Sequence, residues 1–207
     1  MNTIINPKEI EKKSFETITE KLAGRQLDPQ NANIIKRVIH TTADFDYLDN
    51  LTFSADAAKK ARKILKNGAN IVTYTQMAKA GINKKAASQL GCNLYCFIDS
   101  AEVAAIAQTN ETTRSHAAVD RASEIVKKPI IFVVGNAPTA LIRLYELITE
   151  HAYNPDFIIA VPVGFVNVVE SKELIMKLDT PHIVAKGQKG GSNVAAAICN
   201  ALLYDII

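Results

Sequence analysis

The sequence predicts an α/β protein, in which an open, doubly wound sheet of five parallel strands follows a helical N-terminal part. From residue 70 onwards, short runs rich in β-branched residues alternate with helix-like segments. The runs are almost continuously apolar, which a strand requires when helices cover both faces of its sheet. Five βα repeats in about 135 residues are too few for a closed eight-stranded barrel and favour an open sheet.

Residues 1–69 are predicted to be helical and to join the repeats of residues 70–207 in a single domain. The expected helices are Pro7 to Leu22, one that begins at Asp28-Pro29, and Ser54 to Asn67. Asp28 serves as the expected N-cap, Pro29 as the first-turn proline and Gly68 as a helix stop. Because no linker rich in Pro, Ser or Gly separates the two parts, we expect one domain over residues 1–207.

The five expected strands are residues 70–74, 93–98, 130–134, 157–161 and 182–185. The helices between and after them are 76–90 (broken near Gly81), 101–126 (broken near Asn110), 139–151, 168–178 and 192–203. A flavodoxin-like strand order is the commonest for five strands of this kind.

Composition narrows the classes of protein and of partner. The chain has 207 residues, 48% apolar and 22% charged, which excludes a disordered or low-complexity protein. Its net charge of 24 − 21 = +3 is small for a duplex-binding protein but suits a small anionic ligand. We expect no nucleic-acid partner.

The N-terminus lacks the apolar core of a secretory signal, and no apolar run approaches the roughly 18 residues of a membrane span. We therefore expect a cytoplasmic location without membrane attachment, with Cys92, Cys96 and Cys199 as free thiols.

Uncommon residues follow four of the expected strands. In an open parallel sheet, ligands bind beyond the carboxyl ends of the strands, where the strand order reverses. The segments found there are Tyr74-Thr-Gln-Met77, Gly135-Asn-Ala-Pro-Thr139, Pro162-Val-Gly-Phe-Val166 and Lys186-Gly-Gln-Lys-Gly-Gly-Ser192. Gly135 and Gly164 are expected to let the backbone approach a ligand, and Asn136 can donate and accept hydrogen bonds.

The strongest candidate anion site is Lys189-Gly190-Gly191-Ser192. It opens a helix, where free backbone N–H groups and the helix dipole favour a carboxylate or phosphate. Neither a G-x-x-x-x-G-K-[ST] loop nor a G-x-G-x-x-G fingerprint occurs in the chain, so nucleotide binding has no support. Arg37, Arg114 and Lys172 could extend the site, although an ordinary surface charge is the more common role for any one such residue.

His40 is the candidate general acid or base. It ends the helical run that begins at Ile34 and shares a polar face with Lys36 and Arg37; Asp44, four residues on, could hold its ring. The competing interpretation is a surface or capping histidine. His151 and His182 have routine structural explanations, and His116 is ambiguous. The sequence has no metal-ligand spacing and no G-x-S-x-G turn.

Eight segments together resemble one enzyme family. They are Ser14-Phe15, Arg37-Val-Ile-His40, Ile71-Val-Thr73 with Met77 and Gly81, Thr113-Arg-Ser115, Gly135-Asn-Ala-Pro-Thr-Ala-Leu141, Val161-Pro-Val-Gly-Phe-Val166, Glu170-Ser-Lys-Glu173 and Gly190-Gly-Ser192. With these segments, which occur in the order found in the family, the sequence resembles the precorrin-8X methylmutases of cobalamin biosynthesis over nearly its whole length. One departure is Tyr74-Thr75-Gln76, which stands where many relatives have an acidic residue.

The resemblance implies an isomerase that moves a methyl group from C-11 to C-12 of a corrinoid macrocycle. The product would be hydrogenobyrinate, or cobyrinate where cobalt is already inserted. It also implies a flavodoxin-like homodimer, His40 as the proton donor or acceptor, and Ser14 and Arg37 as substrate contacts. Further expected substrate-binding residues are Gln76, Arg114, Gly135, Asn136, Thr139, Gly164, Phe165, Val166, Lys172, Lys189, Gly190, Gly191 and Ser192.

No separate cofactor is expected for this rearrangement, because any cobalt arrives within the substrate. His40 as an imidazolium would protonate or hydrogen-bond a ring nitrogen and so lower the barrier to a 1,5-shift. Two other hypotheses remain open on the residues alone. One is a non-catalytic corrinoid carrier, and the other is an isomerase or transferase that acts on a small phosphorylated metabolite at the helix beginning near Gly190.

Overall fold

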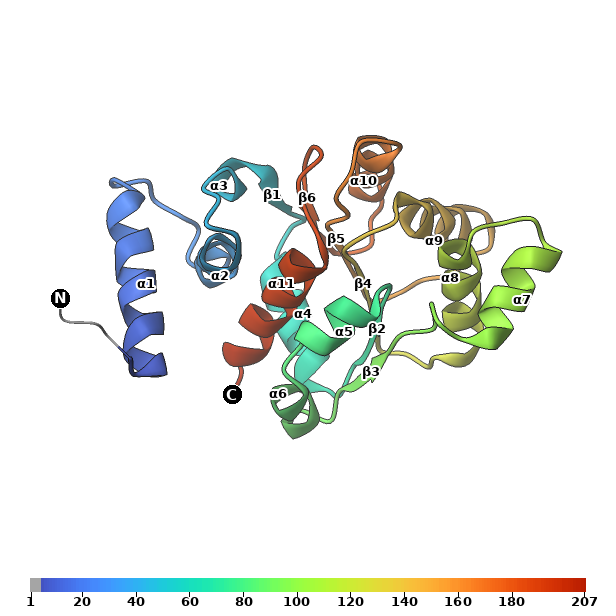
Figure 1. The fold of residues 1–207 in the computed structure, drawn as a ribbon, viewed down its shortest axis with the longest axis horizontal. Coiled ribbons are helices and arrows are strands. Elements are labelled where there is room, and N and C mark those ends of the chain that lie inside the picture. Colours follow the sequence, from blue (N-terminus) through green and yellow to red (C-terminus); the bar gives the residue numbers. More distant parts are fainter. Residues whose placement is uncertain (1–4) are drawn as a thin grey trace.

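Eleven helices and six strands form within residues 5–207, which a computed structural model describes (Figure 1). Residues 1–4 of the expected N-terminal part lie outside this range. The helices are α1 (Pro7–Lys21), α2 (Ala32–Thr42), α3 (Tyr47–Asn50), α4 (Ala57–Lys66), α5 (Gln76–Gly81), α6 (Lys84–Gln89), α7 (Ala101–Thr109), α8 (Arg114–Ile125), α9 (Pro138–Glu150), α10 (Val168–Met176) and α11 (Ser192–Tyr204). The strands are β1 (Leu51–Phe53), β2 (Asn70–Thr73), β3 (Asn93–Tyr95), β4 (Ile130–Val134), β5 (Phe157–Ala160) and β6 (His182–Ala185).

The six strands form one sheet in the order β1-β6-β5-β4-β2-β3. All neighbours are parallel except β1, which pairs antiparallel with β6. The five parallel strands thus follow the flavodoxin-like order, and the α/β fold class is confirmed. Because β2 lies between β3 and β4, the chain leaves β2 and β4 toward opposite edges of the sheet. The crevice between these two strand ends is the point where the strand order reverses.

Helices cover both faces of the sheet, which explains the continuous apolar runs. Alternate strand residues enter two separate cores. Ile131 and Val133 of β4 pack in one core with α2, α4 and α11, whereas Phe132 and Val134 pack in the other with α8, α9 and α10. Helices from the N-terminal part therefore share a core with strands of the βα repeats.

The helix that carries His40 lies along the last helix of the chain. At one end of α2, Asn33 donates a hydrogen bond to Asp205, which directly follows α11. At the other end, Asp44 accepts one from Lys189, which precedes α11. The two helices are consequently antiparallel, and the C-terminal end of α2 lies on the same side of the molecule as the carboxyl ends of the strands. Helix α1 packs on α2 at the outer flank (Figure 1).

The N-terminal part departs from the expected all-helical structure. Strand β1 adds an antiparallel edge, and with three residues it is too short to show a period. The short helix α3 was also not expected. The signal at Asp28-Pro29 forms a turn instead of a helix start. The Asp28 carboxylate accepts hydrogen bonds from Gln30 N and Asn31 Nδ2, at 2.9 and 2.8 Å, and α2 begins only at Ala32.

The remaining elements agree with their expected positions to within a few residues. Strand β3 ends at Tyr95, earlier than expected, at the point where its ladder with β2 stops. The Thr73 hydroxyl donates to the Tyr95 carbonyl there. The helix breaks near Gly81 and Asn110 are both present. No helix of residues 5–207 is long and apolar enough to cross a membrane. Cys92 and Cys199 are buried free thiols, and Cys96 is half-buried.

Candidate functional site

His40 lies on a groove between α1 and α2. The groove has a volume of about 650 Å³, and its lining includes Lys13 and Ser14 of α1, His40 of α2, and Phe45 just beyond α2. The His40 side chain is exposed, and the Ser14 hydroxyl donates to the carbonyl of Ile10, one turn earlier on α1. This groove therefore brings together two of the residues expected to contact substrate.

The ring of His40 contacts an aromatic ring and not the expected carboxylate. Its centroid lies 5.5 Å from that of Phe15, and the two planes are tilted by 35°. Asp44, which we expected to hold the imidazole, instead accepts hydrogen bonds from Lys189 Nζ and from the backbone of Asp46. Among the described residues, His40 has no hydrogen-bond or ion-pair partner, so both ring nitrogens are available to a ligand.

Arg37 joins three helices beside the groove. Its guanidinium carbon lies 5.0 Å from the centroid of Phe15 on α1 and 5.1 Å from that of Tyr204 on α11. Its Nη1 donates to the carboxylate of Glu11 at 2.7 Å. Arg37 therefore stabilises the packing of α1 on α2 and α11 by cation–π contacts and an ion pair. Phe15 contacts both Arg37 and His40 and so fixes one against the other.

The expected glycines bring protein segments together at the carboxyl ends of the strands. A Cβ added to Gly135 would lie 2.8 Å from the Cβ of Ala195 on α11, and one added to Gly190 would lie 2.2 Å from the carbonyl oxygen of Val161. The close approach that we expected of Gly135 toward a ligand is thus, in this structure, an approach to the start of α11. Gly164, at a φ of +148°, donates its N–H to the carbonyl of Gln188 at 3.1 Å.

At the expected anion site at the start of α11, several polar groups already have partners within the protein. The Gly191 N–H donates to the Val161 carbonyl at 2.9 Å, and the Ser192 hydroxyl lies 2.7 Å from the Thr75 hydroxyl. The Lys189 ammonium donates to Asp44 and Asp46 at 2.6 Å each, which raises the pKa of Lys189 and lowers that of Asp44. The charge of Lys189 is consequently directed toward the end of α2.

Lys172 lies beneath this segment and has 1% of its surface exposed. Its Nζ donates to the carbonyls of Gly187 and Lys189 at 2.6 and 2.9 Å, respectively. Burial lowers the pKa of the Lys172 ammonium to about 8. In this position Lys172 contacts the loop from inside, where a ligand on the surface would not reach it.

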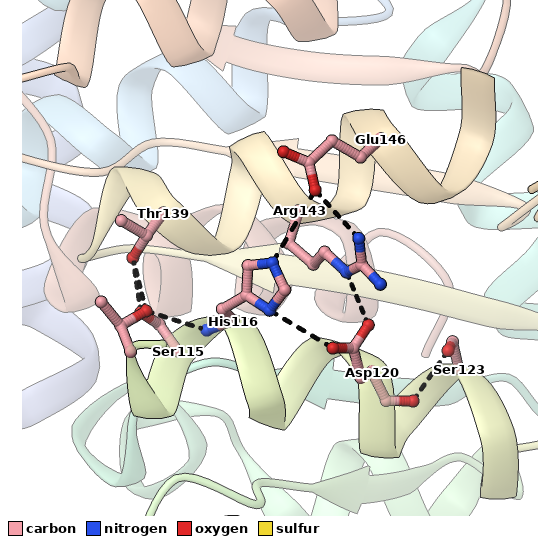
Figure 2. Close-up of polar contacts among 8 residues, drawn as sticks. Ser115, His116, Asp120, Ser123, Thr139, Arg143 and Glu146 are labelled. Carbon is pink, nitrogen blue, oxygen red and sulfur yellow. Dashed lines mark hydrogen bonds and ion pairs between the residues drawn. The ribbon is translucent and has the colours of Figure 1, made fainter. Parts of the chain in front are cut away.

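A cluster of hydroxyl groups lies between the starts of α8 and α9 (Figure 2). The hydroxyls of Ser115 and Thr139 are 2.5 Å apart, and that of Thr113 lies 2.8 Å from Ser115. Tyr74 follows β2, and burial is the largest cause of a raised pKa of its hydroxyl. The cluster therefore joins the starts of α8 and α9.

His116 belongs to an ionic network between α8 and α9 (Figure 2). Its Nδ1 lies 3.3 Å from Asp120 and its Nε2 lies 3.7 Å from Glu146. Arg143 donates to both carboxylates, at 2.6 and 2.9 Å. This arrangement gives His116 a structural explanation, since its charge partners come from the two helices that it joins.

The other expected residues are placed apart from one another. Asn136 is exposed at the reversal point, and Gln76 donates from there to Asp99 at 2.8 Å. Phe165 and Val166 are 86% and 73% exposed after β5. Arg114 lines a separate hollow of about 550 Å³ beside α7. The structure thus places His40 and Ser14 on one groove and joins Gly135, Gly191 and Ser192 at the strand ends, while Lys189 connects the two regions through Asp44.

Three contributors to this region were not among the expected site residues. Phe15 and Phe45 flank His40, and Thr75 binds Ser192 while its hydroxyl also caps α5 at Ala78. Thr75 carries a recognisable signal, because a hydroxyl directly after a strand and before a helix is a typical N-cap. Phe45 follows a helix end in a turn, and nothing in its sequence position indicates that it lines the groove.

Comparison with known proteins decides the family. A model of the precorrin-8X methylmutase family matches residues 9–205. The cobalt-precorrin-8 methylmutase of Salmonella typhimurium is 46% identical and covers 100% of this chain and 99% of its own length. The chain belongs to the precorrin-8X methylmutase family. The cobalt-precorrin-8 methylmutase of Leptospira interrogans is 38% identical over 94% of the chain and 91% of the relative.

The fold agrees with that assignment. The crystal structure of the precorrin-8X methyl mutase from Thermus thermophilus matches with a TM-score of 0.87 and 34% identity, over 95% of each chain. In this member of the precorrin-8X methylmutase family, the groove between α1 and α2 and the loops at the strand ends hold the candidate site residues.

Proposed function

We propose that this chain is a cobalt-precorrin-8 methylmutase, an isomerase that moves the C-11 methyl group of the macrocycle to C-12 in cobalamin biosynthesis. The relatives from Salmonella and Leptospira both carry that name. A relative from Pseudomonas aeruginosa, named precorrin-8X methylmutase, is 35% identical over 93% of each chain. The relatives from Salmonella and Leptospira are more similar to this chain than the Pseudomonas relative, which favours a substrate that already contains cobalt. The metal is then part of the substrate, and no separate cofactor takes part.

The observation that carries the proposal is the presentation of His40. Its ring is exposed on a groove and has no carboxylate partner among residues 5–207, so its nitrogens can reach a bound ligand. An imidazolium that donates to a ring nitrogen withdraws electron density from the conjugated system. Because that withdrawal favours migration of the neighbouring methyl group, His40 acts as the general acid of the 1,5-shift.

Cationic and hydroxyl groups around His40 suit a macrocycle with several carboxylate side chains. Lys13, Ser14 and Lys21 line the same groove. We propose that the acetate and propionate groups bind these residues together with Arg37, Asn136 and Thr139, and that Phe165 and Val166 contact the apolar face of the macrocycle. Gln76, Arg114 and Gly164 complete the proposed set at the strand ends.

We also propose that the enzyme is a cytoplasmic homodimer. The part of the chain that the structure describes exposes large apolar side chains, including Met77 at 71% as well as Phe165 and Val166. We expect a ligand or a second subunit to cover these side chains, because large exposed apolar surfaces mark such contacts. A macrocycle is also large relative to one chain of 207 residues, which favours a site that a second subunit completes.

The time course of the absorbance spectrum tests this function. Purified enzyme mixed with cobalt-precorrin-8 is expected to convert the substrate spectrum into that of cobyrinate, because the shift changes the conjugation of the ring. A spectrum that changes on binding and then stays constant would instead identify a carrier. Absence of any binding would favour the phosphorylated-metabolite enzyme, and a titration with precorrin-8 measures the preference for cobalt.

A further inference from the structure

Lys172 is a buried cation without an acidic partner. It lies on α10 with 1% of its surface exposed, and among the described residues no carboxylate pairs with it. Its ammonium donates only to two backbone carbonyls, those of Gly187 and Lys189. Burial of an ammonium is unfavourable unless its hydrogen bonds are satisfied. A lysine in such a place therefore points to a role in holding the conformation of the loop whose carbonyls it binds.

The loop from Lys186 to Gly191 is fixed at both sides as well as from beneath. The Lys186 N–H donates to the Asn50 carbonyl at 2.8 Å, and the Gly164 N–H donates to the Gln188 carbonyl at 3.1 Å. The Gly191 N–H closes the loop against Val161. Lys172 thus completes a set of hydrogen bonds that gives the backbone of Lys189 a single position.

From that position, the side chain of Lys189 reaches the turn that follows α2. Its Nζ donates to Asp44 and Asp46, at 2.6 Å each. These ion pairs are partly exposed, and such pairs contribute little when both partners are free to move. Because the backbone of Lys189 is already held, Lys189 loses less conformational freedom when it pairs with Asp44 and Asp46. The buried hydrogen bonds of Lys172 therefore strengthen the exposed ion pairs of Lys189.

The turn held by Lys189 is continuous with the end of α2. Asp44 accepts a hydrogen bond from Asp46 N at 2.9 Å and donates its own N–H to the Thr42 hydroxyl at 3.2 Å. The Ala43 N–H donates to the carbonyl of Ile39 at 2.7 Å. Ala43 and Phe45 line the groove beside His40, so movement of this turn changes the surroundings of the imidazole.

We infer that Lys172 is a positioning residue for His40, acting through the backbone of the loop and the ion pairs of Lys189 with Asp44 and Asp46. This inference rests on the proposed function in assigning chemistry to the groove. The physical connection from Lys172 to the end of α2 does not depend on that function. Lys172 and Lys189 act in series, and loss of either releases the same turn.

Hydrogen exchange followed by mass spectrometry tests the connection without substrate. In Lys172→Met, which keeps the length of the side chain and removes its donors, exchange is expected to rise about tenfold both in the loop and in residues 39–47. Lys189→Met is expected to raise exchange in residues 39–47 by a similar factor. Lys177→Met, just beyond the end of α10 and exposed, is the control and should leave both segments unchanged.

Unchanged exchange in residues 39–47 of both variants would overturn the inference, whether or not the enzyme turns over a corrinoid. Should Lys172→Met fail to fold, Lys172→Gln, which keeps an N–H donor at a shorter reach, replaces it, and Lys189→Met tests the second link independently. A wild-type protein that does not convert cobalt-precorrin-8 would count against the proposed function and would leave the exchange result intact.

Kinetics separate positioning from substrate binding. Lys172→Met is expected to lower kcat about tenfold and to change KM less than about threefold, since a misplaced general acid slows the chemical step. The double variant with Lys189→Met should lose no more than the larger single loss, because both changes release one turn. If the kcat losses of the two single variants multiply in the double variant, the inference is contradicted. A rise in KM with kcat unchanged in Lys172→Met would also contradict it.

Discussion

At the scale of single residues, the site depends on side chains that the fold leaves free. The exposed ring of His40 lies beside that of Phe15 and has no carboxylate partner within residues 5–207, whereas His116 is held between Asp120 and Glu146. The two histidines thus have opposite surroundings. A histidine enclosed by its own carboxylates is committed to structure, and one without such partners can serve a ligand.

Replacement of His40 by alanine is expected to lower kcat by a factor of roughly 10² to 10⁴, the usual contribution of a general acid. Binding of the macrocycle should change only a few-fold, because the groove remains. Initial rates and an absorbance titration measure the two quantities. Thr41→Ala is the control, since its hydroxyl donates to the Arg37 carbonyl on the surface of the same helix. A native rate in His40→Ala would contradict the assignment.

Phe165 gives a second prediction at this scale. Its side chain is 86% exposed, so Phe165→Ala should leave the stability of the fold within about 0.5 kcal/mol. If the macrocycle covers this ring, the variant should raise KM roughly tenfold or more, which corresponds to the burial of an aromatic side chain. Ile125→Ala, on an exposed position of α8, is the control. An unchanged KM would remove Phe165 from the binding surface.

At the scale of elements, the strand-end loops are held by close backbone contacts. Gly190 touches the Val161 carbonyl where a Cβ would lie 2.2 Å away, and Gly187 has open space around it. The sequence predicted that glycines gather at the strand ends. It could not indicate that they face other loops, because the partner of a glycine is set by tertiary packing and leaves no local pattern.

Gly190→Ala is accordingly expected to destabilise the protein by about 1 to 3 kcal/mol or more, through overpacking against backbone. Gly187→Ala should lower the free energy of unfolding by about 1 kcal/mol, because of the backbone strain at its φ of +72° alone. Urea unfolding midpoints compare the two variants. Equal midpoints would show that the loop yields to the added methyl group.

Lys172 makes the stability of the fold depend on pH. Its folded pKa of about 8 lies below the unfolded value of 10.5, so between these values the unfolded state binds more protons. The cost of the buried charge is fully present below pH 8 and disappears as the pH rises to 10.5. Relative to Lys172→Met, the wild type should therefore gain up to about 3 kcal/mol over this range. Urea unfolding at several pH values measures the difference, and a constant difference would contradict the shift.

At the scale of the whole molecule, much of the architecture could be predicted from sequence. The five apolar runs such as Ile130–Val134 became the five parallel strands, because burial on both faces leaves a strong pattern. Strand β1 and the start of α2 could not be predicted, since one is three residues long and the other was displaced by the turn at Asp28. The ion pair of Asp44 with Lys189 could not be predicted either, because the two residues are 145 positions apart in the sequence.

The proposed dimer gives a prediction for the assembled protein. Light scattering on the purified enzyme is expected to return twice the mass of one chain, and the midpoint of thermal unfolding should rise with protein concentration. The exposed apolar side chains of a single chain support this expectation. A constant midpoint together with the mass of one chain would exclude the dimer.

The outlying position of α1 has a consequence for altering the enzyme. This helix forms one wall of the groove and packs chiefly on α2, with Ile18 as its member of the main core (Figure 1). Lys13 and Thr17 face the groove. Substitutions at these two positions are expected to leave the sheet and its two cores intact. Libraries confined to this wall could therefore change which macrocycles the enzyme accepts, by resizing one side of the groove while His40 on the opposite wall stays in place.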